Sequence, residues 1–300
     1  QIANPNLTWE TTKQFDIGLE FGLFEDRISG EIDFYNKTTK DLLLLVPVPA
    51  TTGFVSQRQN IGEMQNYGFE ILLNSINYAN KNLIWRTSFN FSRNINRLRS
   101  LSKDQTSIPP PYSSYLNGIF IDQPMAVFYG PKYAGVDPAN GDALYYANEE
   151  LTETTNDYNS AAKLFLGSPN PDFITGLTNE LSYKNFDLLF LLQGVYGNKI
   201  YQAAGGYYSN NAYWFDNNTV DQMERWQNPG DITDVPQARL GQCNGCSASS
   251  RYISDGSYLR LKTISLAYSF PEKWNDKLKI QDAKIYIIAQ NLLTFTKYNG

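Results

Sequence analysis

The feature that most constrains the fold is a long, two-faced strand near the end of the chain. Apolar side chains alternate with small polar ones at Ile264, Leu266, Tyr268 and Phe270. Successive side chains of a strand point to opposite faces, so this strand has one apolar and one polar surface. The strand fills most of residues 257–270, whereas strands of soluble proteins usually run about 5–6 residues and a tilted strand that crosses a bilayer needs about 9–11. Its length and its terminal aromatic residue are typical of an outer-membrane β-barrel.

Seven further segments show the same alternation. They are residues 15–23, 28–44, 67–78, 83–94, 173–183, 186–196 and 283–292. The connections after the first, third, fifth and seventh strands are short, whereas residues 47–63, 97–172 and 198–257 form long connections. Outer-membrane barrels have short periplasmic turns and long outer loops, so the long connections are predicted to be extracellular. Residues 112–136 have some strand character and are predicted to form an extracellular hairpin or hook, because a single extra crossing would break this parity.

The two faces of these strands differ in what they can contact. In residues 85–92, one face carries Trp85, Thr87, Phe89 and Phe91, and the other carries Arg86, Ser88, Asn90 and Ser92. Arginine and asparagine side chains are costly against lipid. The second face is therefore predicted to line the lumen of the barrel, and the first to contact outer-membrane lipid.

Composition supports this fold class and excludes several functions. Aromatic residues make up 14% of the chain, which fits the aromatic girdles of such barrels. The mean hydropathy is −0.42, and no apolar run approaches the about 20 residues that a spanning helix needs. With a net charge of −5 and no basic cluster, the chain lacks the surface that nucleic acid binding requires.

The residue types also argue against an enzyme, a cofactor or a metal site. The chain has no histidine, which is the commonest general base and metal ligand. Acidic residues occur on the polar faces of the first strands at Asp16, Glu20, Glu31, Asp33 and Glu70. They are interpreted as charges that line the lumen, because nothing in the sequence places an acid beside a base at a bound substrate.

Two short motifs resemble metal or redox sites but are interpreted as structural. Cys243 and Cys246 form a lone CxxC, and a zinc site would need two further ligands. In an extracellular loop they are predicted to form a disulfide that braces a turn. Residues 137–142, DPANGD, are superficially similar to a calcium loop but lack its full spacing and terminal Glu, and are interpreted as a turn.

The last long loop is rich in aromatic residues. One interpretation is a stacking platform for substrate, such as sugar rings, or a contact for a partner protein. The other is that the rings pack the loop against the mouth of the barrel. The candidates are Tyr201, Tyr207, Tyr208, Tyr213, Trp214, Phe215 and Trp226.

A closed barrel of eight strands is one possible arrangement, but the ends of the chain argue against it. The sequence starts without an initiating Met or a signal peptide, and residues 297–300 follow an upward strand with no closing strand. Open strand edges in hydrocarbon cost several kcal/mol for each unpaired group. The chain is therefore expected to be one portion of a larger barrel.

Five motifs, in order, resemble those of the SusC/RagA family of TonB-dependent outer-membrane transporters. They are NPNLTWETT (4–12), GSPNPDF (167–173), SYKNFDL with QGVYGN (182–198), DGSYLRLK (255–262) and QNLLTFTKY (290–298). Thr263 stands where the family usually has Asn. The resemblance implies that residues 1–300 are the C-terminal part of a plugged barrel of about 22 strands. It also implies that the plug, the TonB box and the last strand lie outside this sequence.

The resemblance further implies an active importer in a Bacteroidetes-type outer membrane. Such an importer works with a SusD-like surface lipoprotein as a lid and is powered by the TonB–ExbB–ExbD complex. The cargo would be an oligosaccharide, which the aromatic loop favours, or a peptide. Two alternatives stay open: a siderophore or cobalamin receptor without a lid, and a secreted β-sandwich that binds glycans, although the strands are long for the latter.

Overall fold

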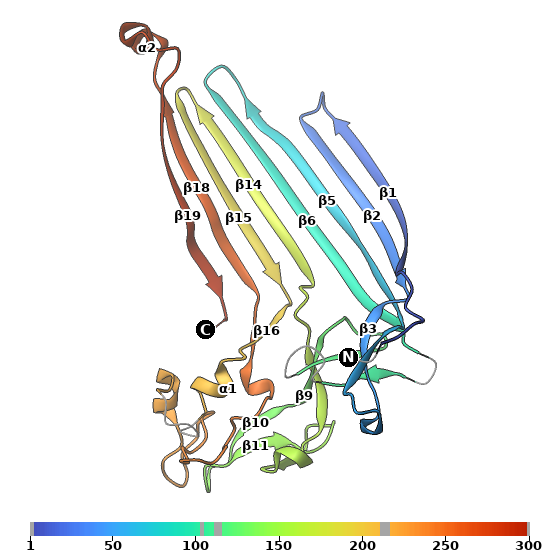
Figure 1. Ribbon diagram of the computed structural model, residues 1–300. Helices are drawn as coiled ribbons and strands as arrows, with labels where there is room; N and C mark the ends of the chain where they lie inside the picture. Colours follow the sequence, from blue (N-terminus) through green and yellow to red (C-terminus); the bar gives the residue numbers. More distant parts are fainter. Residues whose placement is uncertain (1–2, 103–104, 111–115, 211–216, 299–300) are drawn as a thin grey trace.

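The main element of the computed structural model is one antiparallel sheet of eight strands, which pair in chain order (Figure 1). The structure describes residues 3–102, 105–110, 116–210 and 217–298. The strands of the sheet are β1 (Thr11–Leu23), β2 (Ile28–Lys40), β5 (Glu63–Ala79), β6 (Leu83–Ser100), β14 (Phe173–Tyr183), β15 (Phe186–Tyr196), β18 (Tyr258–Ser269) and β19 (Lys284–Thr296). They correspond to the eight predicted segments, so the all-β antiparallel fold is confirmed.

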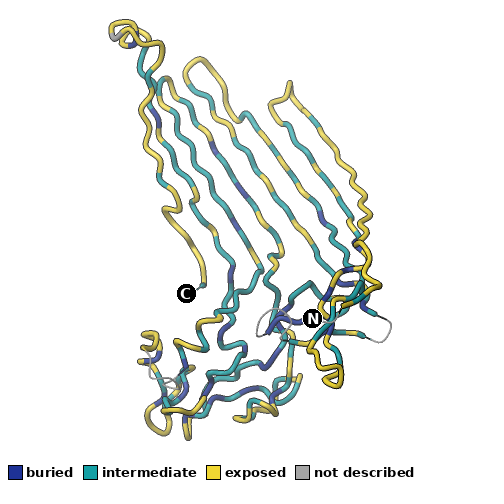
Figure 2. The backbone as a smooth tube through the Cα atoms, in the orientation of Figure 1, coloured by how far each residue is buried: buried dark blue, intermediate teal, exposed yellow. Residues whose placement is uncertain are grey.

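The two ends of the sheet differ in the way its strands are connected. The turns after β1, β5, β14 and β18 lie at one end, and the three long connections lie at the other (Figure 1). β1 and β19 form the two open edges and are exposed along almost their whole length (Figure 2). The sheet is therefore a section of a barrel wall and not a closed barrel.

The register of the strands separates an apolar outer face from a polar inner face. Residues that pair directly lie on the same face of a sheet. One outer row consists of Phe21, Gly30, Leu73, Phe89, Leu177, Leu192, Leu261 and Leu293. The neighbouring inner row consists of Glu20, Glu31, Leu72, Asn90, Gly176, Gln193, Arg260 and Thr294. Adjacent residues of each strand therefore point to opposite faces, and across all eight strands one face is almost entirely apolar and the other mostly polar.

Two belts of aromatic contacts cross the outer face at different heights. The belt at the loop end consists of Phe69, Phe91, Phe173 and Tyr196, whose successive ring centroids lie 5.6, 5.3 and 5.2 Å apart. The belt at the hairpin end consists of Phe186, Tyr268, Phe270 and Trp274, with separations of 4.7, 5.5 and 5.8 Å. β14 runs from one belt to the other in 11 residues. This corresponds to about 33 Å along the strand, or about 25 Å along the membrane normal at the usual tilt, which is the height of the apolar band in outer-membrane barrels.

The second strand ends earlier than its sequence pattern predicts. Alternation continues to Leu44, but the pairing of β2 with β5 stops at Lys40, and Asp41 adopts a φ of 58°. The chain then forms a separate hairpin of β3 (Leu43–Pro47) and β4 (Ser56–Asn60). Leu42 and Leu44 pack there in a small core with Leu98, Leu101, Ile108 and Ile119. The long connections consequently span residues 41–62, 101–172 and 197–257.

The long connections contain small sheets of their own. One sheet has the order β13 (Lys163–Gly167), β9 (Val127–Pro131), β8 (Asn117–Phe120) and β7 (Ser107–Ile108). A second has the order β10 (Tyr133–Val136), β11 (Ala143–Tyr146) and β12 (Thr154–Thr155), and β16 (Lys199–Tyr201) pairs with β17 (Ile253–Asp255). Of the hairpin or hook predicted within residues 112–136, β8 and β9 form an antiparallel pair, whereas β10 pairs with β11 outside that range; residues 112–115 lie outside the described part.

Helical segments within the described residues are short. They are α1 (Gly205–Tyr208), α2 (Glu272–Leu278), and the 3-10 turns η1 (Ala50–Thr52), η2 (Tyr158–Ser160), η3 (Val220–Glu224) and η4 (Ser250–Tyr252). α2 lies within the connection between β18 and β19 that the sequence pattern presents as a turn. Within the described residues, no helix is long and apolar enough to span a membrane.

Gly68 of β5 is predicted to tolerate no side chain. A Cβ atom at this position would overlap the main-chain oxygen of Arg93 and lie 2.8 Å from Tyr35 Oη. We expect Gly68→Ala to destabilise the full-length protein by about 1–3 kcal/mol, because backbone must shift to admit the methyl group. At Gly18, on the same face, the added methyl would meet only the carboxylate of Asp33, which can rotate away. Urea unfolding followed by gel mobility should therefore show a clearly lower midpoint for Gly68→Ala and a nearly unchanged midpoint for Gly18→Ala. Equal midpoints for the two variants would contradict the assigned register.

Candidate functional site at the inner face and the long connections

Charged side chains are distributed unevenly over the inner face of the sheet. Five carboxylates lie on β1, β2 and β5, namely Asp16, Glu20, Glu31, Asp33 and Glu70. At the opposite edge of the same face, on β15, β18 and β19, Arg260 Nε donates to Thr294 Oγ1 at 3.0 Å. Lys284 Nζ lies 2.9 Å from Asp187 Oδ2 there. The described residues contain no group of three or more His, Cys, Asp or Glu side chains arranged to hold a metal ion. The inner face is thus a polar surface on which acidic side chains lie mainly on β1, β2 and β5.

A hollow of about 430 Å³ lies at the loop end of the inner face. It opens where β6 continues beyond β14, because the pairing of these strands begins at Ser92 and Ile174. It is lined by Met64, Asn66, Ser92, Asn94, Asn96, Met125, Asn170, Pro171, Phe173 and Ile174. Four of these residues are asparagines, so amide groups dominate the polar part of the wall.

Hydrogen bonds hold the amides of this hollow in place. Asn96 Nδ2 donates to Asn66 Oδ1 at 2.7 Å, and Asn96 Oδ1 accepts from the main-chain nitrogen of Met125 at 2.7 Å. Tyr35 Oη donates to Asn94 Oδ1 at 3.0 Å. An amide can both donate and accept. The arrangement is therefore suited to hydroxyl or peptide groups of a neutral polar ligand.

The aromatic candidates of the last loop do not form one surface. Tyr207 and Tyr208 lie in α1, are exposed, and have perpendicular rings with centroids 5.1 Å apart. Tyr201 lies in β16, with its ring 6.2 Å from that of Phe128. Tyr213, Trp214 and Phe215 lie outside the described residues. Among the placed candidates, Tyr207 and Tyr208 are the most exposed to solvent.

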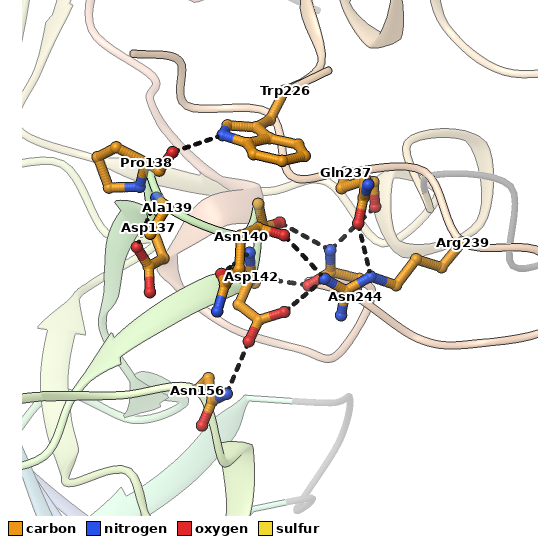
Figure 3. A network of polar contacts seen from close by, with 12 residues as sticks. Asp137, Pro138, Ala139, Asn140, Asp142, Asn156, Trp226, Gln237, Arg239 and Asn244 are labelled. Carbon is orange, nitrogen blue, oxygen red and sulfur yellow. Dashed lines mark hydrogen bonds and ion pairs between the residues drawn. The ribbon is translucent and has the colours of Figure 1, made fainter. Parts of the chain in front are cut away.

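Trp226 occupies a buried position that favours loop packing over ligand contact. It is 5% exposed, and its Nε1 donates to the main-chain oxygen of Pro138 at 3.0 Å (Figure 3). In the turn at residues 137–142, the main-chain nitrogen of Ala139 donates to Asp137 Oδ1, and that of Asp142 donates to Asn140 Oδ1. The side chains of Asp137 and Asn140 thus accept hydrogen bonds from the backbone of the same segment, which forms the turn that its sequence predicts.

The CxxC motif forms a short disulfide bridge that holds Asn244 against the same turn. Cys243 and Cys246 form a disulfide with their Cα atoms 5.3 Å apart. Asn244 between them is buried; its Oδ1 accepts from the main-chain nitrogen of Ala143 at 2.8 Å, and its Nδ2 donates to the main-chain oxygens of Gly141 and Gln237, each at 2.9 Å (Figure 3). One side chain therefore joins two segments that are about a hundred residues apart in sequence.

Tyrosines form a core beneath this network. Arg251 lies over the rings of Tyr133 and Tyr252, at 5.8 and 5.4 Å from their centroids. Tyr145 packs against Tyr133 at 5.9 Å. Burial raises the pKa of Tyr133, Tyr145 and Tyr252 above its ordinary value. The loops thus have an ordered core of their own outside the barrel wall.

Asp142 is predicted to make the stability of the loops sensitive to acid. Partial burial raises its pKa, but hydrogen bonds from Asn156 and Arg239, with the 2.6 Å ion pair to Arg239, hold the pKa below its ordinary value of 3.8. A lowered pKa stabilises the folded loops above pH 3.8, and this contribution is lost as the pH falls through the folded value. We expect Asp142→Asn to be less stable than wild type at pH 7 and the difference to shrink below pH 4. Thermal unfolding of the two proteins, followed by tryptophan fluorescence at pH 7 and at pH 3.5, tests this, and a pH-independent difference would contradict it.

The comparisons with known proteins decide the family. Residues 1–292 match the family model described as TonB dependent receptor-like, beta-barrel. The chain belongs to this family. Its relatives include proteins named as a TonB-dependent receptor and as a peptide transporter.

Three relatives show how far the similarity extends. TonB-dependent receptor P3 of Formosa agariphila is 35% identical over 315 residues, covering 100% of this chain and 31% of that protein. TonB-dependent receptor SusC of Bacteroides thetaiotaomicron is 30% identical and covers 99% of this chain and 30% of that protein. The structure of the RagAB peptide transporter matches with a TM-score of 0.87 at 30% identity, covering 100% of this chain and 33% of that chain.

These matches confirm the resemblance to SusC and RagA that the five sequence motifs indicate. The TonB-dependent receptor barrel described here spans about a third of the length of the relatives it matches. Sequence reasoning missed the amide-lined hollow of this barrel. The only signal was the recurrence of asparagine at alternate positions of β6, at Asn90, Asn94 and Asn96, which places these amides on the inner face.

Proposed function

We propose that this TonB-dependent receptor barrel is part of the wall of an outer-membrane importer of the SusC/RagA type. The observation that carries the proposal is the division of one sheet into an apolar outer face with two aromatic belts and a polar inner face with an amide-lined hollow at its loop end. Such a wall suits lipid on one side and a polar cargo on the other. The extent of the single sheet, with strands of up to 18 residues, is incompatible with the alternative of a glycan-binding β-sandwich.

The proposed cargo is an oligosaccharide. The exposed rings of Tyr207 and Tyr208 offer apolar faces on which sugar rings can stack, and the amides of Asn66, Asn94 and Asn170 suit sugar hydroxyls. A peptide is the second candidate. It is favoured by the similarity to the RagAB peptide transporter, and the same amides suit peptide groups.

The proposed assembly includes parts that this chain does not contain. The remaining strands and a plug would belong to the two thirds of the relatives' length that the chain does not cover. A SusD-like surface lipoprotein would cover the loop end, and the TonB–ExbB–ExbD complex would supply the energy from the periplasmic side. The alternative within the same class is a siderophore or cobalamin receptor that works without a lid.

Uptake and binding assays with the full-length protein test the proposal. Labelled oligosaccharides and oligopeptides should bind to cells that make the protein, and deletion of TonB should abolish uptake but leave binding intact. A surface lipoprotein should copurify with the importer. Uptake that does not depend on TonB would contradict the mechanism, and uptake of a ferric siderophore or cobalamin without a copurifying lipoprotein would favour the alternative.

A matched pair of variants tests the role of the hollow. Asn94→Ala removes an amide from the hollow and should weaken cargo binding about fivefold, which corresponds to about 1 kcal/mol for a lost hydrogen bond. Asn74→Ala removes an amide from the inner face near the hairpin end, beside Ser29 and Ser88, and should leave binding unchanged. Equal effects of the two variants would remove the hollow from the proposed cargo site.

A further inference from the structure

The helix α2 lies at the hairpin end of the sheet, beyond the last paired residues of β18 and β19 (Figure 1). Pro271 precedes it, and Lys279 ends it with a φ of 55°. Asn275 is buried, and its Nδ2 donates to the main-chain oxygen of Phe270 at 3.3 Å. The helix is therefore held against its hairpin in a fixed orientation.

Trp274 of this helix continues the aromatic belt of the outer face. Tyr268 pairs with Phe186 in the outer row nearest the hairpin end, and Phe270 packs edge-on against Tyr268 at 5.5 Å. The Trp274 ring lies 5.8 Å from Phe270 and is still 55% exposed. Tryptophan and tyrosine are enriched where a membrane meets water, because their rings are apolar and their polar groups can reach water. The belt thus extends past the end of the sheet onto the helix.

The charges of α2 indicate which kind of surface it fits. Glu272 and Asp276 lie on the side of the helix opposite Trp274, since each is two residues away and a helix turns about 100° per residue. Lys277 lies on the same side as Trp274, where its long side chain can reach past apolar groups to a headgroup. With two acidic and two basic residues, the helix has no net charge, which suits a zwitterionic surface better than an anionic one.

We propose that α2 anchors the barrel to the periplasmic leaflet, with Trp274 at the boundary between acyl chains and zwitterionic phospholipid headgroups. This inference rests on the proposed function, which places the outer face in lipid. The helix then fixes the depth of the β18–β19 hairpin in the membrane. It is not a docking surface for a soluble periplasmic protein.

Spin labels on the full-length protein in phosphatidylethanolamine-containing nanodiscs test the proposal. Cysteines are placed singly at Trp274, Lys277 and Asp276, and at Leu266 on the outer face of β18 as a reference. Collisions with oxygen, which partitions into lipid, are compared with collisions with a water-soluble nickel chelate. Lys277→Cys keeps the tryptophan in place, so it reports the depth of the intact helix.

The account predicts that labels at positions 266, 274 and 277 meet oxygen several-fold more often than the chelate, and that the label at position 276 shows the reverse. If position 266 favours oxygen while positions 274 and 277 favour the chelate, the anchor is refuted and the importer proposal stands. If position 266 itself favours the chelate, the outer face is not in lipid and both proposals fail.

Discussion

Phe89→Arg in the full-length protein should destabilise the folded barrel by about 2–4 kcal/mol, whereas Asn90→Arg should leave its stability nearly unchanged. Phe89 lies on the outer face between the two aromatic belts, where it pairs with Leu73 and Leu177. An arginine there would have to enter hydrocarbon or distort the bilayer around it. At Asn90, the next residue, the same side chain would point into the polar interior.

Folding into phospholipid vesicles at a series of urea concentrations measures this difference. The two variants carry the same added charge at adjacent positions, so each is a control for the other in net charge and location along β6. A shift of the midpoint for Phe89→Arg alone supports the assigned faces. Similar shifts for both variants, or a shift for Asn90→Arg alone, would show that the register does not separate lipid from lumen.

Asn244→Ala should loosen the long connections around residues 137–143 and 237–246, with an expected loss of about 2–4 kcal/mol in their local stability. The buried Asn244 side chain satisfies the main-chain groups of Gly141, Ala143 and Gln237, and an unsatisfied buried group costs about 1–3 kcal/mol. The substitution leaves the Cys243–Cys246 disulfide in place. It therefore isolates the contribution of the hydrogen bonds from that of the covalent bridge.

Hydrogen exchange of the segment around Ala143 measures this effect. The main-chain amide of Ala143 should exchange faster by a factor of about 30 or more in Asn244→Ala, since about 2 kcal/mol corresponds to that ratio. Asn228→Ala, an exposed asparagine in the same connection, serves as the matched control and should leave the rate unchanged. Unaltered exchange in Asn244→Ala would show that the CxxC turn does not hold the loops together.

The sequence predicts the barrel wall well because the wall obeys a local rule. Side chains alternate with a period of two, so the pattern from Phe15 to Leu23 or from Phe186 to Tyr196 identifies both a strand and its faces. Loop lengths then determine which end of each strand carries the long connections. Both inferences use neighbouring residues only, and the register in the structure agrees with them.

The parts that the sequence did not predict depend on contacts between distant residues. Leu42 and Leu44 continue the alternation of β2, yet they leave the sheet because they pack with Leu98 and Ile119. The hollow arises because β6 extends beyond the start of β14. This offset depends on how the two strands pair, and the sequence of neither strand predicts it. Trp226 looks like a ligand contact in sequence and is covered by a turn nearly ninety residues away. The loop strands of two to five residues are likewise too short to show the alternation of apolar and polar residues by which a strand is predicted.

Labelling from the lipid phase tests the central claim most directly. Single cysteines at Ser88, Phe89, Asn90 and Phe91 of the full-length protein in bilayers are exposed to a photoreactive probe that dissolves only in the hydrocarbon. The account predicts strong labelling at positions 89 and 91 and almost none at positions 88 and 90. Labelling of 88 and 90 with protection of 89 and 91 would invert the two faces and contradict the importer.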